Sequence, residues 1–278
     1  MLVTSKGLFE IAMKQKFAIP ATNFIDQNTL RAYIAVAEKR QLPLILSFAQ
    51  AHHEVMGLEE AAILGKYYAK KADVPIILHL DHGQDIDFVK KAIDLGFTSV
   101  MIDASQDPFA DNVAKTKEVI TYARPRGVVV EAEIGHVGSG DNYENHDHSE
   151  SFYTATEDAK QFYEETDVDS LAISIGTAHG KYVGKPEINF ERLNEIAHAV
   201  PIPLVLHGGS STGDENLNRC ASNNIVKINI FTDLMDAAVK NFTSDAKNYF
   251  EVQEQLRSGI EKCLDHYYDV FQTKPVAI

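Results

Sequence analysis

Short apolar runs alternate with longer amphipathic stretches along almost the whole chain. The apolar runs have the length of β-strands, recur about every 25–30 residues, and comprise residues 17–23, 43–48, 75–80, 99–103, 128–133, 170–175, 203–207 and 225–230. Stretches of helix length follow them at residues 28–40, 58–71, 86–95, 112–123, 157–165, 190–199 and 214–221, and from Thr232 onward. Asn28, Asp85 and Thr156 have side chains suited to the N-caps of three of these helices. The pattern predicts eight β-then-α units.

The predicted strands are too apolar to have one face in water, which indicates a parallel sheet covered by helices on its outer surface. A (β/α)8 TIM barrel of about 250 residues accommodates eight such units; a doubly wound open sheet is the alternative. No Pro- or Ser-rich linker divides residues 1–278, so we expect a single domain. Beyond Asn241 the chain holds more helix than the eighth unit requires, so we expect extra C-terminal helices.

The composition is that of an ordinary globular protein, with 45% apolar and 24% charged residues. A formal charge of −14 argues against nucleic acid or an anionic membrane as a partner. The two cysteines, Cys220 and Cys263, provide no disulfide framework. The N-terminal residues lack the pattern of a signal peptide, and no apolar run approaches the roughly 18 residues of a membrane span. These features predict a cytoplasmic protein that acts on a small molecule.

Three histidines each follow an apolar run that breaks into small or Gly-rich residues. His82 lies in LHLDHG, His179 in GTAHGKY and His207 in LVLHGGSS. Because the carboxyl ends of all barrel strands meet at one mouth, the three imidazoles would converge there. Three protein ligands with one open position are typical of a catalytic zinc site. Asp81, next to His82, would then place an ionisable group beside the metal, and we therefore predict an enzyme.

Other polar residues also end the predicted strands. They are Asn23, Ser47, Asp103, Glu131, Glu133 and Asn229. We expect Asn23 and Ser47 to contact the substrate. Glu131 and Glu133 are two residues apart and share a face of one strand, so one or both would serve as a metal ligand or as a hydrogen-bond partner of a ligand.

Two segments have the composition of a phosphate site. His207 is followed by Gly208, Gly209, Ser210 and Ser211, and the next predicted strand ends in residues 229–232, with the sequence Asn-Ile-Phe-Thr. Glycines let backbone N–H groups approach an oxyanion, and Ser and Thr hydroxyls add donors at a helix start. The loops after strands seven and eight are the usual phosphate site of this barrel.

The motifs HLDH, MIDAS, VEAEIG, GTAHGKY, LVLHGGS and KINIFTD, in this order, resemble those of the class II, zinc-dependent ketose-bisphosphate aldolases. The resemblance is strongest to the branch that acts on fructose and tagatose 1,6-bisphosphates. It implies that His82, His179 and His207 hold the catalytic zinc and that Asp81 donates and accepts a proton. It also implies that Asp103 and Glu133 contact a second or displaced metal position. The dihydroxyacetone phosphate half would be held by Gly180, Gly208, Gly209, Ser210, Asn229, Ile230, Phe231 and Thr232. A monovalent cation, Na⁺ or K⁺, would bind near that phosphate.

The chain departs from the family pattern at several positions. Phe231 stands where a small or polar residue is usual, and HGGSS replaces the common HGASG. Residues 134–153 form a long polar segment, which we predict to be a mobile lid. There Asp141 stands in place of the family's glutamate, and we expect it to move the C3 proton of dihydroxyacetone phosphate. These departures leave the natural ketose open.

The expected reaction is reversible cleavage of a ketose 1,6-bisphosphate to dihydroxyacetone phosphate and glyceraldehyde 3-phosphate. Another phosphorylated keto sugar, such as a 5-dehydro-2-deoxygluconate phosphate, is the alternative substrate; a non-catalytic sugar-phosphate-binding partner subunit is the alternative class. A Schiff base on Lys227 is the rival mechanism, although we interpret this lysine as structural. Arg257 lies in a segment that resembles the family's Arg-x-Gly, which reaches a neighbouring subunit's mouth. We therefore expect Arg257 to bind the second phosphate in a homodimer or homotetramer.

Overall fold

The eight predicted strands form one closed parallel barrel in a computed structural model, which describes residues 1–135, 153–180 and 186–276. Consecutive strands from β2 to β9 are neighbours, and β9 pairs with β2 to close the barrel. The strands are β2 (Ile19–Asn23), β3 (Leu44–Ala49), β4 (Ile76–Gly83), β5 (Ser99–Ile102), β6 (Val129–Ile134), β7 (Ser170–Ile173), β8 (Leu204–Leu206) and β9 (Ile225–Ile230). The predicted TIM barrel is confirmed.

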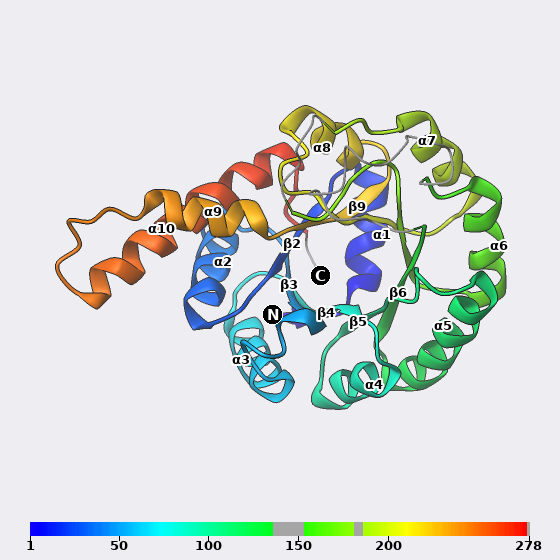
Figure 1. Cartoon of the computed structure of the whole chain (residues 1–278), viewed down its shortest axis with the longest axis horizontal. Helices are drawn as coiled ribbons and strands as arrows, with labels where there is room; N and C mark the ends of the chain where they lie inside the picture. Colours follow the sequence, from blue (N-terminus) through cyan, green and yellow to red (C-terminus); the bar gives the residue numbers. More distant parts are fainter. Residues whose placement is uncertain (136–152, 181–185, 277–278) are drawn as a thin grey trace.

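A helix follows every barrel strand, and these helices surround the barrel (Figure 1). They are α2 (Gln27–Arg40), α3 (Leu58–Lys71), α4 (Ile86–Leu95), α5 (Phe109–Ala123), α6 (Thr156–Thr166), α7 (Phe190–Ala199), α8 (Asp214–Ala221) and α9 (Thr232–Asn241). Two short 3₁₀ segments, η1 (Gln50–His52) and η2 (Arg124–Arg126), lie in the connections. The apolar faces of the helices pack on the outward-facing strand residues in one continuous core.

Two of the three predicted helix caps are wrong. Asp26, rather than Asn28, caps α2: its side chain accepts a hydrogen bond from the Thr29 N–H at 2.7 Å, and the Thr29 hydroxyl accepts one from the Asp26 N–H at 3.2 Å. This reciprocal pair is a capping box. Thr156 is the first residue of α6 instead of its cap. The Asp85 prediction is confirmed, since its carboxylate accepts from the Phe88 N–H at 2.8 Å.

The first elements of the chain, β1 (Leu2–Val3) and α1 (Ser5–Gln15), were not predicted from the apolar pattern. β1 pairs with the start of β4. Leu8, Phe9 and Ala12 of α1 are buried in a separate core cluster with residues of the strand starts, among them Ile19, Ile45, Ile77 and Val226. Helix α1 therefore closes the amino-terminal end of the barrel, opposite the mouth that holds the predicted site.

One helix extends beyond the eight units of the described chain. α10 (Tyr249–Val270) packs against α9 and α2, and the α9–α10 hairpin projects from the side of the barrel (Figure 1). Its projecting part exposes Val239, Phe242, Tyr249 and Phe250, whose exposed fractions lie between 44% and 81%. Among the described residues no helix is both long and apolar enough to cross a membrane.

Candidate active site

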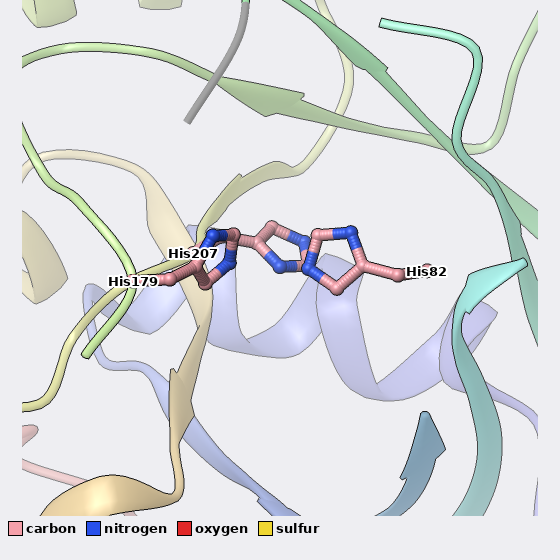
Figure 2. A group of neighbouring side chains, drawn as sticks. All are labelled: His82, His179 and His207. Atoms are coloured by element: carbon pink, nitrogen blue, oxygen red, sulfur yellow. The ribbon is translucent and has the colours of Figure 1, made fainter. Parts of the chain in front are cut away.

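The three predicted metal-binding histidines meet at the carboxyl end of the barrel. His82 lies near the end of β4, His179 follows β7, and His207 follows β8 directly. Figure 2 shows the three rings next to one another, and their centroids are 4.4 Å (His82–His207), 4.9 Å (His82–His179) and 6.1 Å (His179–His207) apart. Each ring offers one nitrogen such that all three nitrogens lie within 4.8 Å of one another. The structure thus brings together three ligands from distant parts of the sequence.

The backbone at His82 lets two consecutive residues face the same cavity. Successive strand residues normally point to opposite faces, yet both Asp81 and His82 line the cavity at the mouth. His82 has a φ of +48°, a left-handed conformation that is uncommon for a residue other than glycine. The pairing of β4 with β5 also shifts register between Leu80 and Gly83. This local irregularity is therefore what places the acid–base candidate beside a candidate metal ligand.

Hydrogen bonds orient His82 and His207 for metal binding. Nδ1 of His82 lies 2.8 Å from Oδ2 of Asp103, so this nitrogen carries the proton and Nε2 is left for a ligand. Nε2 of His82 is buried and has no hydrogen-bond partner within the described chain. Nε2 of His207 lies 3.0 Å from Oε1 of Glu131, which leaves Nδ1 of that ring as its ligand atom. The donor set and its orientation fit a divalent metal such as zinc.

The predicted second metal position shares a ligand with the first. His82, Asp103 and Glu133 also offer ligand atoms within 4.8 Å of one another. Burial opposes the charged form of His82, but Asp81, Asp103 and Glu133 outweigh it and raise the pKa of His82 to about 9. These surroundings therefore stabilise positive charge, which a metal cation would supply in place of the proton.

Asp81 is buried and held by two amides. Asn23 donates to one carboxylate oxygen at 2.9 Å, and Asn229 donates to the other at 2.8 Å. Burial opposes ionisation of Asp81, but the charges of His82 and Lys227 outweigh it and hold the pKa of Asp81 well below its ordinary value. Asp81 is therefore an ionised carboxylate in a fixed orientation, ready to accept a proton from a bound hydroxyl.

A buried polar network lies behind the metal site. The Lys227 ammonium donates to both oxygens of Glu131, at 2.8 and 2.9 Å, and lies 3.0 Å from Nε2 of His79. Nδ1 of His79 lies 2.8 Å from the Ser99 hydroxyl. Burial and the charge of Lys227 together lower the pKa of His79 to about 3, so this ring is neutral. Lys227 does not line the cavity, in agreement with the structural role that we inferred for it.

The two predicted phosphate segments line the same cavity, where glycine is needed for close packing. Gly208 has a φ of +68°, and a Cβ there would lie 2.4 Å from the Ala178 carbonyl oxygen. A Cβ at Gly209 would lie 2.7 Å from the Asn229 carbonyl oxygen, to which the Gly209 N–H itself donates at 3.0 Å. The Gly209 N–H is thus engaged within the protein. A phosphate in this loop must be held by other donors.

The cavity has a volume of about 290 Å³. It is lined by Asn23, Ala51, His52, Asp81, His82, His179, Gly180, Gly208, Gly209, Ser210, Asn229, Ile230, Phe231 and Thr232. Ser47 is fully buried and does not line it. Arg257 does not line it either, because it lies on α10 and pairs with Glu254 and Glu261. Asp141 falls outside the described residues.

Ala51 and His52 line the cavity although neither was among the predicted site residues. From the sequence, His52, His53, His146 and His148 are potential metal ligands that we interpret as solvated; His146 and His148 lie outside the described residues. His52 instead lines the cavity, with its ring centroid 4.8 Å from that of Phe231. No local motif distinguishes it from His53, because the contact depends on a residue far away in the sequence.

A (β/α)8 barrel that collects three histidines and an ionised aspartate around one cavity has the arrangement of a metal-dependent enzyme. The chain belongs to the class II fructose-bisphosphate aldolase family, whose model matches residues 3–275. It is therefore a lyase of the class II aldolase type, as the sequence motifs predicted.

Three solved structures of similar proteins have the same fold as this chain. The YdjI aldolase of Escherichia coli K12 is 31% identical with a TM-score of 0.89, covering 98% of this chain and 97% of that one. A Coccidioides immitis protein whose proposed identity is fructose-1,6-biphosphate aldolase is 26% identical with a TM-score of 0.85, covering 96% and 95%. The fructose-bisphosphate aldolase of Campylobacter jejuni, at 22% identity and a TM-score of 0.80 over 98% and 95%, shares the fold.

Proposed function

We propose that this chain is a zinc-dependent aldolase that reversibly cleaves a ketose 1,6-bisphosphate, that of fructose or tagatose, to dihydroxyacetone phosphate and glyceraldehyde 3-phosphate. The observation that carries the proposal is the convergence of His82, His179 and His207 beside the buried carboxylate of Asp81. Family membership supports the reaction type. The identity of the ketose rests on the resemblance of the motifs.

The chain's own residues have separate tasks in this reaction. Asp81 accepts the proton of the C4 hydroxyl as the C3–C4 bond breaks, and returns it in the condensation direction. Asn23 and Asn229 keep both oxygens of Asp81 in place. A zinc ion held by the three histidines would supply Lewis acidity that stabilises the negative charge developing on the ketone oxygen. Lys227 has no part in the chemistry, since its ammonium is buried against Glu131.

The two phosphates would be bound at opposite ends of the substrate. Gly180, Gly208, Ser210 and the loop of residues 229–232 line the cavity, which supports a site there for the dihydroxyacetone phosphate half with a Na⁺ or K⁺ ion near its phosphate. We assign the second phosphate to Arg257 of a neighbouring subunit, because a planar guanidinium can bind phosphate with two hydrogen bonds. We keep Ser47 as a substrate contact only as a prediction.

Removal of the C3 proton of dihydroxyacetone phosphate is assigned to Asp141 in the 134–153 segment. The Asp141→Ala variant should exchange the C3 protons with solvent more slowly while it keeps its zinc. The exchange is measured by NMR in deuterated water. An exchange rate equal to that of the wild type would remove Asp141 from the mechanism.

A ketose with one phosphate is the second candidate, and one observation favours it. The described residues that line the cavity include no Lys or Arg, and Arg257 is paired with two glutamates on its own helix. A 5-dehydro-2-deoxygluconate phosphate has its phosphate on the dihydroxyacetone phosphate half and a carboxylate on the other half, so it needs no cation for a second phosphate. Values of kcat/KM for cleavage of fructose 1,6-bisphosphate, tagatose 1,6-bisphosphate and this compound decide between the two candidates. A tenfold or larger preference for the compound with one phosphate would overturn the bisphosphate assignment.

We also propose that the enzyme is a cytoplasmic homodimer or homotetramer. The projecting α9–α10 hairpin exposes Val239, Phe242, Tyr249 and Phe250, and exposed apolar side chains gathered on one element are typical of association surfaces. Light scattering of the purified protein tests the assembly. A monomer with full activity on the bisphosphate would also contradict the assignment of Arg257 to a neighbouring subunit's substrate.

A further inference from the structure

One wall of the cavity consists of two aromatic rings that come from opposite ends of the sequence. His52, the last residue of η1, places its ring against that of Phe231, with centroids 4.8 Å apart and planes inclined by 44°. Both residues line the cavity that also contains Asp81 and the metal-binding histidines. The His52–Phe231 wall therefore faces the place where the bond of the substrate is cleaved.

The position of this wall is built into the fold. The carbonyl oxygen of His52 accepts a hydrogen bond from the Val55 N–H at 2.9 Å. The Gln50 side chain accepts one from the Gln84 N–H at 2.8 Å, which ties the loop after β3 to the loop after β4. Phe231 immediately precedes α9. The two rings therefore meet between segments whose backbones are held by hydrogen bonds and by the start of a helix.

The His52 ring has hydrogen-bonding capacity that the described protein does not use. No hydrogen bond joins the ring to another described residue, and its Nδ1 atom is buried without a partner. Burial lowers the pKa of His52, so the ring is neutral at pH 7 and has one donor and one acceptor. A neutral ring of this kind suits a hydroxyl group.

We propose that the His52–Phe231 wall determines specificity for the aldehyde half of the substrate, with His52 forming a hydrogen bond to the hydroxyl on the carbon next to the aldehyde carbon. Phe231 holds the imidazole in place from the side. This inference rests on the proposed aldolase function, in which dihydroxyacetone phosphate is the other half. The ligand class that it assigns to this wall is a hydroxylated aldehyde carbon chain.

The test compares two aldehydes that differ in this one hydroxyl. Condensation of dihydroxyacetone phosphate with 2-hydroxypropanal and with propanal yields two kcat/KM values, and their ratio is the hydroxyl preference. His52→Phe keeps an aromatic wall but cannot form the hydrogen bond. We expect the variant to lower the preference about tenfold, the effect of losing one hydrogen bond to a neutral group. Comparing the ratio between enzymes cancels the intrinsic reactivities of the two aldehydes.

Three further variants separate recognition from structure. His52→Asn keeps a donor and an acceptor and should retain part of the preference. Phe231→Ala should lower the preference through the loss of support for His52. The matched control is His53→Ala, because His53 neighbours His52 but contacts Phe88, at a centroid distance of 5.3 Å, and does not line the cavity. It should keep the wild-type preference.

The outcomes are distinct. An equal hydroxyl preference in wild type and in both His52→Phe and Phe231→Ala would overturn this inference while the aldolase proposal stands. A wild-type protein that condenses dihydroxyacetone phosphate with neither of these aldehydes and cleaves none of the three ketose phosphates would overturn the aldolase proposal and this inference with it. Should His52→Phe fail to fold, as judged by circular dichroism, His52→Asn and Phe231→Ala carry the test.

Discussion

Replacing Glu131 with glutamine should weaken metal binding from a position that does not touch the metal. Glu131 is buried and accepts hydrogen bonds from Lys227 at 2.8 and 2.9 Å; it also lies 3.0 Å from Nε2 of His207. The carboxylate keeps the proton of His207 on Nε2, so that Nδ1 is the ligand atom. Glutamine removes the negative charge and offers one oxygen where the carboxylate has two. The His207 ring then loses its preferred tautomer and orientation.

The Glu131→Gln substitution should change both the metal affinity and the stability of the protein. Loss of a hydrogen-bond partner of a metal-binding histidine typically lowers metal affinity about 10–100-fold. Glu131→Gln also leaves the fully buried Lys227 ammonium without its counter-charge, and breaking such a pair costs about 3–5 kcal/mol of unfolding free energy. The double variant Glu131→Gln/Lys227→Met should recover most of that stability, because methionine needs no partner. Its metal affinity should stay low, since the neutral amide oxygen of glutamine is a weaker acceptor for the Nε2–H of His207 than the carboxylate.

Two measurements separate these effects. Urea unfolding of the chelated protein reports stability without metal, and zinc titration against a competing chelator reports affinity. The matched control is Glu118→Gln, which breaks a surface pair with Lys90 and should change neither. Zinc affinity equal to that of the wild type in the double variant would refute the reasoning, because Glu131 would then have no influence on the His207 ligand.

Four further outcomes are expected. Exhaustive chelation should abolish cleavage and zinc should restore it; full activity without metal, with borohydride trapping of Lys227, would favour a Schiff base. Asp81→Ala should keep its zinc and lose at least about 10²-fold in kcat, whereas near-normal turnover would remove Asp81 as the proton acceptor. Arg257→Ala should raise KM for the bisphosphate far more than KM for dihydroxyacetone phosphate; equal effects would contradict its role. Protonated His82, whose pKa is raised, stabilises the metal-free protein fully below pH 6.5, and this stabilisation is lost as the pH rises through about 9. Because zinc competes with the proton for His82, zinc affinity, measured by titration, should increase with pH over that range.

The architecture was predictable from the apolar pattern because each strand is buried on both faces and each helix on one. The predicted strand bounds agree with β2 to β9 within three residues. The pattern failed at α1, because Leu8, Phe9 and Ala12 form only a short apolar face and the strand before it, β1, has only two residues. It also failed at the start of α2, where Asp26 caps the helix through a capping box with Thr29.

Some residues of the candidate site could likewise be predicted from the sequence, and others could not. His82, His179 and His207 could be predicted because each ends an apolar run, and parallel strands bring such ends together in a closed barrel. His52 could not be predicted, since it is recognisable only by its contact with Phe231. Arg257 shows the converse: a motif indicated a substrate contact, while the structure of one chain pairs it with Glu254 and Glu261.

The sequence by itself determined the barrel, the three histidines of the candidate metal site and the family, because periodicity and motifs are properties of short segments. Tertiary structure alone decided the orientation of the groups. It set the left-handed backbone that turns both Asp81 and His82 into the cavity, and the contact of Glu131 with His207 that selects a ligand nitrogen. The physical reason is that residues 131 and 207, which are 76 positions apart, form a hydrogen bond only when the barrel brings their strands together.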